Sequence, residues 1–278
     1  MASNSKIEWT DHTFNPWIGC TNISPGCDHC YAEAWSKRSG LVKWGNSPRR
    51  RTSEAYWRSP LRWQATAATF ERQHGRRQRV FCASLADVFD NQADSDWRAD
   101  LFSLIAATPS IDWLLLTKRP QNIARMLPER WPPDGMRNVW LGTTAEDQTR
   151  FDQRWPLLAQ IPAAVRFVSY EPAIGPVRLN KAHDIQPDWL IIGGESGPRA
   201  RHMNARWVRD VVSDCRKLRV APFFKQWGAI GNNPLVTEQK RSPKEAALAD
   251  TFGKGGGLLD HKLVREFPNP RGLLIVAA

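Results

Sequence analysis

Residues 113–119 read Trp113-Leu114-Leu115-Leu116-Thr117-Lys118-Arg119, a short apolar run that ends in polar residues. A brief run of consecutive apolar residues is typical of a strand that is buried on both faces of a sheet. The same pattern recurs along the chain after residue 78, which predicts a series of such strands. The further predicted strands cover residues 80–84, 139–143, 166–170, 189–193 and 221–225.

Helical patterns fill several of the gaps between these strands. Residues 96–106 and 205–219 place their apolar side chains at the spacing of one helix face. A further helix is predicted for residues 31–39, with Gly40 as its stop signal. Alternating strands and helices indicate an α/β protein with a mainly parallel sheet, either an open sheet or a barrel of the TIM type, complete or partial.

Polar side chains follow nearly every predicted strand. In open parallel sheets and in TIM-type barrels, reactive residues gather at the carboxyl ends of the strands. The sequence therefore predicts a shared cleft at this end of the sheet. The residues concerned are Asp87, Thr117, Lys118, Arg119, Thr143, Thr144, Glu146, Ser169, Glu171, Glu195, Ser196, Lys225, Gln226 and Trp227.

The strongest chemical signal is a group of three cysteines, Cys20, Cys27 and Cys30, within eleven residues. Thiolates are soft ligands that suit zinc and iron–sulfur clusters. A four-iron cluster held by three thiolates keeps one iron open for a substrate or cofactor. Zinc completed by His12 or His29 is the alternative, because a structural zinc site needs four ligands. A redox pair of Cys27 and Cys30 is a third possibility that leaves Cys20 without a role.

Composition restricts the class of protein further. The chain has 278 residues, of which 41% are hydrophobic and 24% are charged, as in a folded globular protein. Its apolar runs are too short to span a bilayer, and its first residues lack a secretory signal, so we expect a cytoplasmic protein without membrane contact. In such a compartment the cysteines are not expected to form disulfides. Cys82 and Cys215 lie in apolar patterns and are predicted to be buried thiols.

The formal charge of +11 suits a polyanionic partner, with nucleic acid as the first candidate. Residues 40–79 interleave arginines with tryptophans and form a candidate nucleic-acid face, with a solvated helical insertion as the alternative. We predict a main domain over residues 1–230 and a C-terminal loop and extension over residues 231–278. Glycine-rich turns within residues 231–257 suggest a mobile loop.

Short motifs follow one another in a fixed order over almost the full chain. Together they resemble a phage-associated protein family, first described as phage gene products of unknown function, that is similar to radical S-adenosylmethionine (SAM) enzymes. The motifs include Ile7-Glu8-Trp9-Thr10, Asn15-Pro16, Gly19-Cys20, Ser24-Pro25-Gly26-Cys27, Cys30-Tyr31-Ala32-Glu33, Leu116-Thr117-Lys118-Arg119-Pro120, Glu171-Pro172, Gly193-Gly194-Glu195-Ser196-Gly197-Pro198 and Lys225-Gln226-Trp227-Gly228.

The resemblance implies a partial (β/α)6 barrel with a 4Fe-4S cluster on Cys20, Cys27 and Cys30, and with SAM at the open iron. Cleavage of SAM would then give methionine and a 5′-deoxyadenosyl radical that takes a hydrogen atom from the substrate. The six residues between Cys20 and Cys27 exceed the usual spacing of radical SAM enzymes. The residues expected at the cofactor are Ser84, Asp87, Thr117, Thr143, Ser169, Glu171, Gly194 and Glu195, and those expected at the substrate are Lys118, Arg119, Lys225 and Trp227.

We therefore expect an iron–sulfur enzyme of the radical SAM type that modifies or repairs nucleic acid or a nucleotide and receives electrons from a donor protein. The alternative is a zinc- or cluster-binding nucleic-acid-binding protein without catalysis. The two expectations differ in the metal and in whether SAM is cleaved, and both include nucleic acid as the partner.

Overall fold

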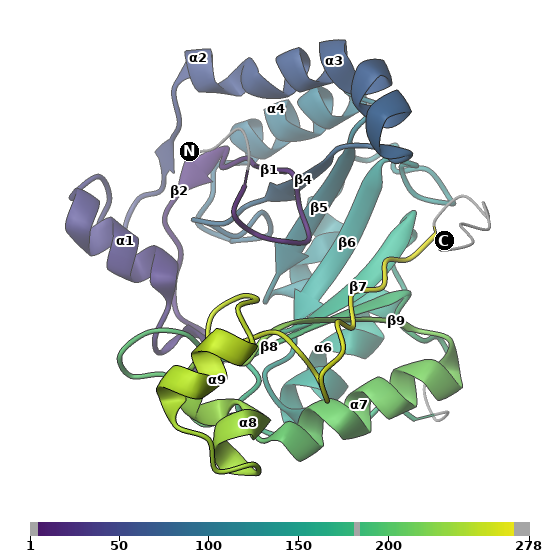
Figure 1. Cartoon of the computed structure of the whole chain (residues 1–278). Helices are drawn as coiled ribbons and strands as arrows, with labels where there is room; N and C mark the ends of the chain where they lie inside the picture. The colour runs from purple at the N-terminus through teal and green to yellow at the C-terminus, as the bar shows by residue number, and fades with distance from the viewer. Residues whose placement is uncertain (1–4, 181–183, 270–278) are drawn as a thin grey trace. The chain divides into compact units, whose positions relative to one another are not determined.

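The computed structural model of the chain describes residues 5–180 and 184–269 (Figure 1). The chain divides into two compact units. The first contains Met1–Thr143 and Gln160–Ala164, and the second contains Thr144–Ala159 and Val165–Ala278. The described part of the predicted C-terminal extension, residues 231–269, falls within the second unit, and residues 270–278 lie outside the described residues.

The first unit is built on parallel strands (Figure 1). Cys82 is in register with Leu115, and Leu115 with Leu141, so apolar side chains line up across neighbouring strands. Nearly all residues of these strands are buried, which explains their uninterrupted apolar sequences. The strands, in spatial order, are β1 (His12–Thr13), β4 (Arg79–Cys82), β5 (Asp112–Thr117) and β6 (Val139–Thr144), and a separate antiparallel pair joins β2 (Trp17–Ile18) to β3 (Arg50–Arg51).

Two helices of the first unit have capping residues that suit a helix end. Gly40 adopts φ 64° after α1, a left-handed conformation that suits glycine at a helix end. Asp94 accepts a hydrogen bond from the Asp96 amide and caps α4. The helices are α1 (Tyr31–Ser39), α2 (Glu54–Trp57), α3 (Ser59–His74), α4 (Ser95–Ala106) and α5 (Ile123–Met126), with 3-10 turns η1 (Pro25–Cys27) and η2 (Pro120–Asn122).

Within residues 40–79 the helices begin at Glu54, and two of the tryptophans on them are buried. Trp57 and Trp63 are 7% and 8% exposed, so their ring faces are not open to nucleic-acid bases. Arg51 lies over the Trp57 ring and pairs with Asp100. Trp57, Trp63 and Arg51 therefore make contacts within the protein itself, whereas the candidate nucleic-acid face on residues 40–79 as a whole stays a prediction.

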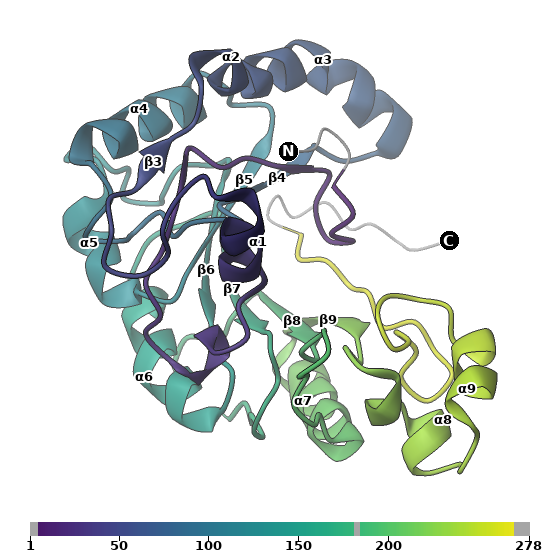
Figure 2. The same ribbon diagram turned by 90° about the vertical axis from the view of Figure 1, so that its left-hand side faces the viewer.

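The second unit also has a parallel sheet, in the order β7 (Val165–Tyr170), β8 (Trp189–Gly193) and β9 (Ala221–Gln226). Helix α7 (Ala205–Leu218) packs along β9, as both views show (Figures 1 and 2). The remaining elements are α6 (Gln148–Ala159), η3 (Ile230–Asn232), α8 (Pro234–Thr237) and α9 (Pro243–Ala249).

The predicted mobile loop at residues 231–257 is instead hydrogen-bonded to its surroundings. Asp250 is 3% exposed and accepts a hydrogen bond of 2.9 Å from the Gly257 amide. The Trp227 amide donates to the Gly256 carbonyl at 2.8 Å. These bonds attach the glycine-rich segment to the end of β9, and its glycines allow the close backbone approach.

The sequence predictions of fold class agree with both units. Every predicted strand overlaps an observed one, and the parallel α/β arrangement is confirmed within each unit. Cys82 and Cys215 are fully buried, as predicted. In the part of the chain that the structure describes, no helix has the length and apolar character that a bilayer span requires.

Candidate functional site

The three cysteines lie on one loop between β2 and α1. Cys20 follows Gly19 directly after β2, Cys27 ends η1, and Cys30 is the N-cap residue of α1. None of them forms a disulfide. Cys27 is buried, whereas Cys20 and Cys30 are partly exposed. Ser24, Pro25 and Gly26 supply the turn that brings the chain back toward Cys27, whose amide donates to the Ser24 carbonyl at 2.8 Å.

Cys20 is held in place by its neighbours on both sides. The Gly19 amide donates to the Leu85 carbonyl, and the Cys20 carbonyl accepts a hydrogen bond from the Gly45 amide at 2.9 Å. Gly19 has φ 115°, and an added Cβ would lie 3.0 Å from Cδ of Arg49, so a side chain here would be strained and crowded. The backbone of the first cysteine is therefore fixed relative to the residues that follow β4.

Arg119 connects the end of β5 to Cys20. Its Nη1 atom lies 3.5 Å from the Cys20 Sγ atom and 2.9 Å from Oδ2 of Asp87. Its Nη2 atom donates to the Thr21 carbonyl at 2.9 Å. Both side chains of the Arg119–Asp87 ion pair are nearly inaccessible, at 7% and 6% exposure. A guanidinium therefore lies against the sulfur of the first cysteine.

The Asp87 carboxylate organises this end of the unit. It accepts hydrogen bonds from the Thr117 hydroxyl at 2.7 Å, from the amides of Phe89 and Lys118, and from Arg119. These four bonds satisfy both of its oxygens. The sequence prediction that Asp87 and Thr117 lie together is confirmed, and their geometry gives them the role of orienting Arg119. A direct role of either residue toward a cofactor stays a prediction.

A second buried ion pair lies on the same turn. Arg49 Nη2 is 2.6 Å from Asp90 Oδ2, and it also donates to the Thr21 hydroxyl at 2.8 Å. Arg49 was expected on a solvent-exposed nucleic-acid face, but its side chain is 1% exposed. The burial follows from the carboxylate of Asp90 and the carbonyls of the 45–47 turn, which together satisfy its guanidinium.

Cys30 is connected to the end of β4 through its neighbour in the chain. The Tyr31 hydroxyl donates to the Ser84 carbonyl at 2.7 Å. The Ser84 hydroxyl accepts a hydrogen bond from Nδ2 of Asn15, and the Asn15 Oδ1 atom accepts one from the Leu85 amide at 2.7 Å. The predicted site residue Ser84 is thus within the same local network as the cysteine loop.

Burial raises the pKa of both partly exposed thiols. Burial raises the pKa of Cys20 to about 11, and Asp87 adds to this rise while Arg119 opposes it. Burial also raises the pKa of Cys30, against the amides of Glu33 and Ala32 at the start of α1 and the charge of Lys118. Metal binding to such thiols releases their protons, so metal affinity should increase with pH.

Thiols are the kind of ligand that iron–sulfur clusters take, and three cysteines without disulfides lie on this one short loop. Among residues 5–180 and 184–269, no three His, Cys, Asp or Glu side chains form a group arranged to hold a metal ion. Ligation of a cluster by Cys20, Cys27 and Cys30 therefore stays a prediction.

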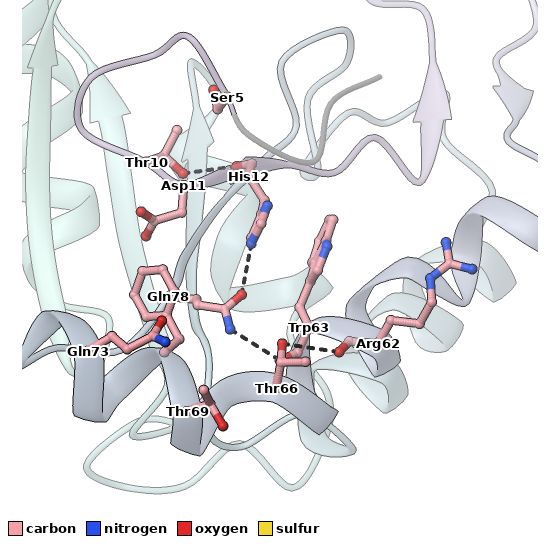
Figure 3. A pocket seen from close by; sticks show the side chains of 11 residues that line it. Ser5, Thr10, Asp11, His12, Arg62, Trp63, Thr66, Thr69, Gln73 and Gln78 are labelled. Carbon is pink, nitrogen blue, oxygen red and sulfur yellow. Dashed lines mark hydrogen bonds between the residues drawn. The ribbon is translucent and has the colours of Figure 1, made fainter.

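His12, one of the two histidines considered for zinc, has other partners. Its Nε2 atom is 2.8 Å from Oε1 of Gln78, and its ring stacks on Trp63 at 4.2 Å. The Gln78 amide nitrogen donates to the Trp63 carbonyl, which orients the amide oxygen toward His12. Figure 3 shows this arrangement in a pocket of about 640 Å³ lined by α3 and the N-terminal segment. Because Gln78 precedes β4, the pocket lies at the strand end opposite to Ser84.

In the second unit, predicted site residues from neighbouring strand ends come together. Lys225 Nζ lies 2.8 Å from Oε1 of Glu171, and the Ser169 hydroxyl lies 3.4 Å from Oε2 of the same carboxylate. The Glu171 and Lys225 side chains are 16% and 22% exposed. The carboxylate passes over Gly193 of β8, where any Cβ atom would obstruct it. This confirms the expected gathering of polar groups within the unit.

Three other predicted residues of this unit have structural partners. Glu195 accepts two hydrogen bonds from the Arg201 side chain and one from the Arg201 amide, and it is 7% exposed. The Gly194 amide donates to Gln226 of β9. Trp227 is fully buried, and its indole N–H donates to the Leu258 carbonyl. A role of Trp227 toward a substrate stays a prediction.

Comparison with known proteins adds a family. A family model described as a protein of unknown function, DUF5131, matches residues 4–267. The chain belongs to this family. No curated protein and no solved structure matches it.

Two site features of this DUF5131 chain were missed by sequence reasoning. Arg49 and Asp90 form their buried pair across 41 residues of sequence, and Asn15 bridges to the end of β4 across a still longer interval.

Thr143 was predicted as a site residue, and it is in register with Thr117 at 0% exposure. Within the described residues its hydroxyl has no hydrogen-bond partner.

Proposed function

We propose that the first unit binds a 4Fe-4S cluster through Cys20, Cys27 and Cys30, and that the protein is an enzyme similar to radical SAM enzymes. The observation that carries the proposal is the loop of three unpaired thiols after the first strands, with Arg119 in contact with Cys20 Sγ. The partial (β/α)6 barrel implied by the resemblance is part of this proposal, and the parallel strands of each unit support it. When bound and reduced, such a cluster supplies the electron that cleaves SAM.

The chain's own residues would prepare this site. The three thiols would act as ligands after losing their protons. Arg119 and Lys118 place positive charge near Cys20 and Cys30, which favours an anionic cluster there. Burial of Cys27 and of the Arg119–Asp87 pair limits access of water to one side of the loop.

The proposed substrate is nucleic acid or a nucleotide, and the proposed electron source is a donor protein. The charge of +11 supports a polyanion, although Arg49, Arg51 and Arg76 pair with carboxylates of the same unit. The logarithm of the association constant for a labelled oligonucleotide should decrease linearly with the logarithm of the salt concentration. An affinity independent of salt would contradict the choice of a polyanionic substrate.

The experiment that tests the metal centre is anaerobic reconstitution of the full chain with iron and sulfide. We expect about four iron atoms and four sulfides per chain with a visible charge-transfer absorption. The variant Cys20→Ser/Cys27→Ser/Cys30→Ser should lose both. Cys215→Ala is the matched control, because it removes a buried thiol of the second unit and should keep the cluster. A colourless protein with stoichiometric zinc would support the alternative of a zinc-binding protein without catalysis.

The reaction class needs its own assay. The reconstituted protein, reduced in the presence of SAM, should produce methionine and 5′-deoxyadenosine. A fully loaded cluster that produces neither with several reductants would exclude the radical SAM proposal and leave a cluster-binding protein.

A further inference from the structure

We infer that helix α3 of the first unit binds single-stranded nucleic acid, with phosphates on Arg58 and Arg62 and with one base in the pocket beside the helix. The inference rests on the proposed function for the chemical nature of the partner. It goes further by naming the surface, the form of nucleic acid and the residues that contact it, none of which belongs to the cysteine loop.

One face of α3 carries hydrogen-bonding side chains and no carboxylate. Residues 58, 62, 66, 69 and 73 follow one another at intervals of three or four residues, so their side chains lie on the same face. Glu71, the only acidic residue of α3, lies about half a turn away from Arg62 around the helix axis, on the opposite side. The residues of the face are Arg58, Arg62, Thr66, Thr69 and Gln73, and all of them are exposed.

The arginines of this face keep their charge available to a ligand. Arg62 donates to the Ser59 hydroxyl at 3.0 Å, and within the described part of the chain neither Arg62 nor Arg58 pairs with a carboxylate. Arg76 differs, because it pairs with Asp11, and this pair also compensates the charge of the carboxylate that lines the pocket. Guanidinium N–H groups match the oxygens of a phosphate, so this face is complementary to a polyanion.

The same face borders the pocket of about 640 Å³ that Figure 3 shows. A volume of this size is usual for pockets that hold small organic groups. Phe70, which is half-buried, gives the pocket an apolar wall. The Gln73 amide offers both a donor and an acceptor, and no described residue forms a hydrogen bond with it. The Thr69 hydroxyl accepts from Arg72 at 3.1 Å and keeps its own proton for a further acceptor. An apolar wall beside an amide suits an unstacked base, which is bound through its hydrogen-bonding edge.

The form of the nucleic acid follows from these two features together. The bases of an intact duplex are paired and stacked, so none of them can enter a pocket beside a helix. Arg58 lies about one helical turn before Arg62, or ~5.4 Å along the axis, and can therefore contact a second phosphate of the same strand. A nucleoside monophosphate has one phosphate and can use only one of the two arginines.

The test is fluorescence anisotropy of the full chain with a labelled single-stranded oligothymidylate at several salt concentrations. We expect Arg62→Gln to weaken binding severalfold and to reduce the slope of log affinity against log salt by roughly 0.7, the contribution of one phosphate contact on a single strand. Arg216→Gln is the matched control, because it removes an exposed arginine from α7 of the second unit and should keep the wild-type affinity and slope. Both side chains are exposed, so both variants should keep the wild-type free energy of unfolding within about 0.5 kcal/mol.

A second variant tests the base pocket separately from the charge. Gln73→Leu removes the hydrogen-bonding amide but no charge, so it should weaken binding severalfold while the salt slope stays at the wild-type value. An abasic oligonucleotide of the same length keeps the phosphates, and the wild type and Gln73→Leu should bind it equally. A duplex of the same length and thymidine monophosphate should each compete with the labelled strand severalfold less well than the unlabelled strand does.

Three results would overturn the inference. The first is an affinity of Arg62→Gln equal to that of the wild type or of Arg216→Gln, and the second is an unchanged affinity of Gln73→Leu. The third is competition by the duplex or by the monophosphate as strong as that by the single strand. Each of them leaves the proposed function intact, because the wild type would still bind nucleic acid or a nucleotide. Failure of the wild-type chain to show any salt-dependent binding would instead refute the proposed substrate.

Discussion

The ammonium of Lys225 and the carboxylate of Glu171 form an ion pair of 2.8 Å that joins the ends of β9 and β7. The strand between them, β8, ends at Gly193, and the Glu171 carboxylate occupies the space that a Cβ atom would need there. The absence of a side chain at one residue thus permits an ion pair between two others. Gly194, the next residue, is restricted differently, because a Cβ atom there would lie 2.1 Å from the Trp227 carbonyl oxygen.

Alanine substitutions at these two glycines should have different effects. Gly194→Ala forces a Cβ atom into backbone, so we expect it to lower the free energy of unfolding by at least ~1–3 kcal/mol. Gly193→Ala meets only the end of the flexible Glu171 side chain, which can swing aside, so its cost should stay below ~1 kcal/mol. Urea denaturation of both variants measures the difference. A larger loss for Gly193→Ala would contradict this account of the two contacts.

The ion pair itself should be measurable by a double-mutant cycle. Because the two side chains are 16% and 22% exposed, solvent screens them partly, and we expect a coupling free energy of roughly 1 kcal/mol between Glu171→Gln and Lys225→Met. The coupling should decrease as salt is added. Additive effects of the two substitutions on the free energy of unfolding would mean that the pair contributes nothing to stability.

Sequence patterns predicted the framework well because local periodicity determines it. The helix predicted for residues 31–39 coincides with α1, and Gly40 ends it in the left-handed conformation. The strand predicted from Trp113 is observed as Asp112–Thr117. Apolar runs and helix stop signals act over a few residues, so they can be read without knowledge of the tertiary structure.

The partners of polar side chains were less predictable, because they lie far apart in the sequence. Nothing local to Arg49 indicates that Asp90 will bury it, and an arginine-rich stretch is more simply read as a solvated or nucleic-acid-binding face. Glu195 was expected in a cleft, but Arg201 binds it on the following loop. The sequence therefore located polar groups at the strand ends, whereas the contacts that decide their roles required the structure.

Asp87 should be one of the most sensitive positions of the first unit. Asp87→Ala removes the carboxylate that Arg119 and Thr117 contact and leaves a buried guanidinium without its partner. Loss of one member of a buried ion pair typically costs ~3–5 kcal/mol of the free energy of unfolding. Asp134→Ala, at an exposed position, is the control and should change it by less than ~0.5 kcal/mol. Similar unfolding midpoints in urea for the two variants would refute the organising role of Asp87.

His12 should make the protein less stable in mild acid. Burial lowers its pKa below the ordinary histidine value, and the hydrogen bond to Gln78 and the charge of Asp11 only partly oppose this effect. The unfolded chain therefore binds a proton near ~pH 6.5, while the folded protein binds it at lower pH, so the free energy of unfolding decreases as the pH falls below ~6.5. This loss is complete once the pH is below the folded-state pKa.

The variant His12→Gln retains an amide donor for Gln78 and has no titrating ring. Its free energy of unfolding should therefore fall less than that of the wild type between about pH 7.5 and about pH 5.5, as measured by urea denaturation at several pH values. Burial raises the pKa of Asp11, but Arg76 and Arg79 lower it by more, so the net shift is downward. The contribution of Asp11 to the free energy of unfolding is therefore lost only as the pH falls below ~3.9. This pH range is separate from the range in which His12 titrates. Parallel pH profiles for the two proteins would show that His12 titrates alike in the folded and unfolded chains, against the burial and hydrogen bonding described above.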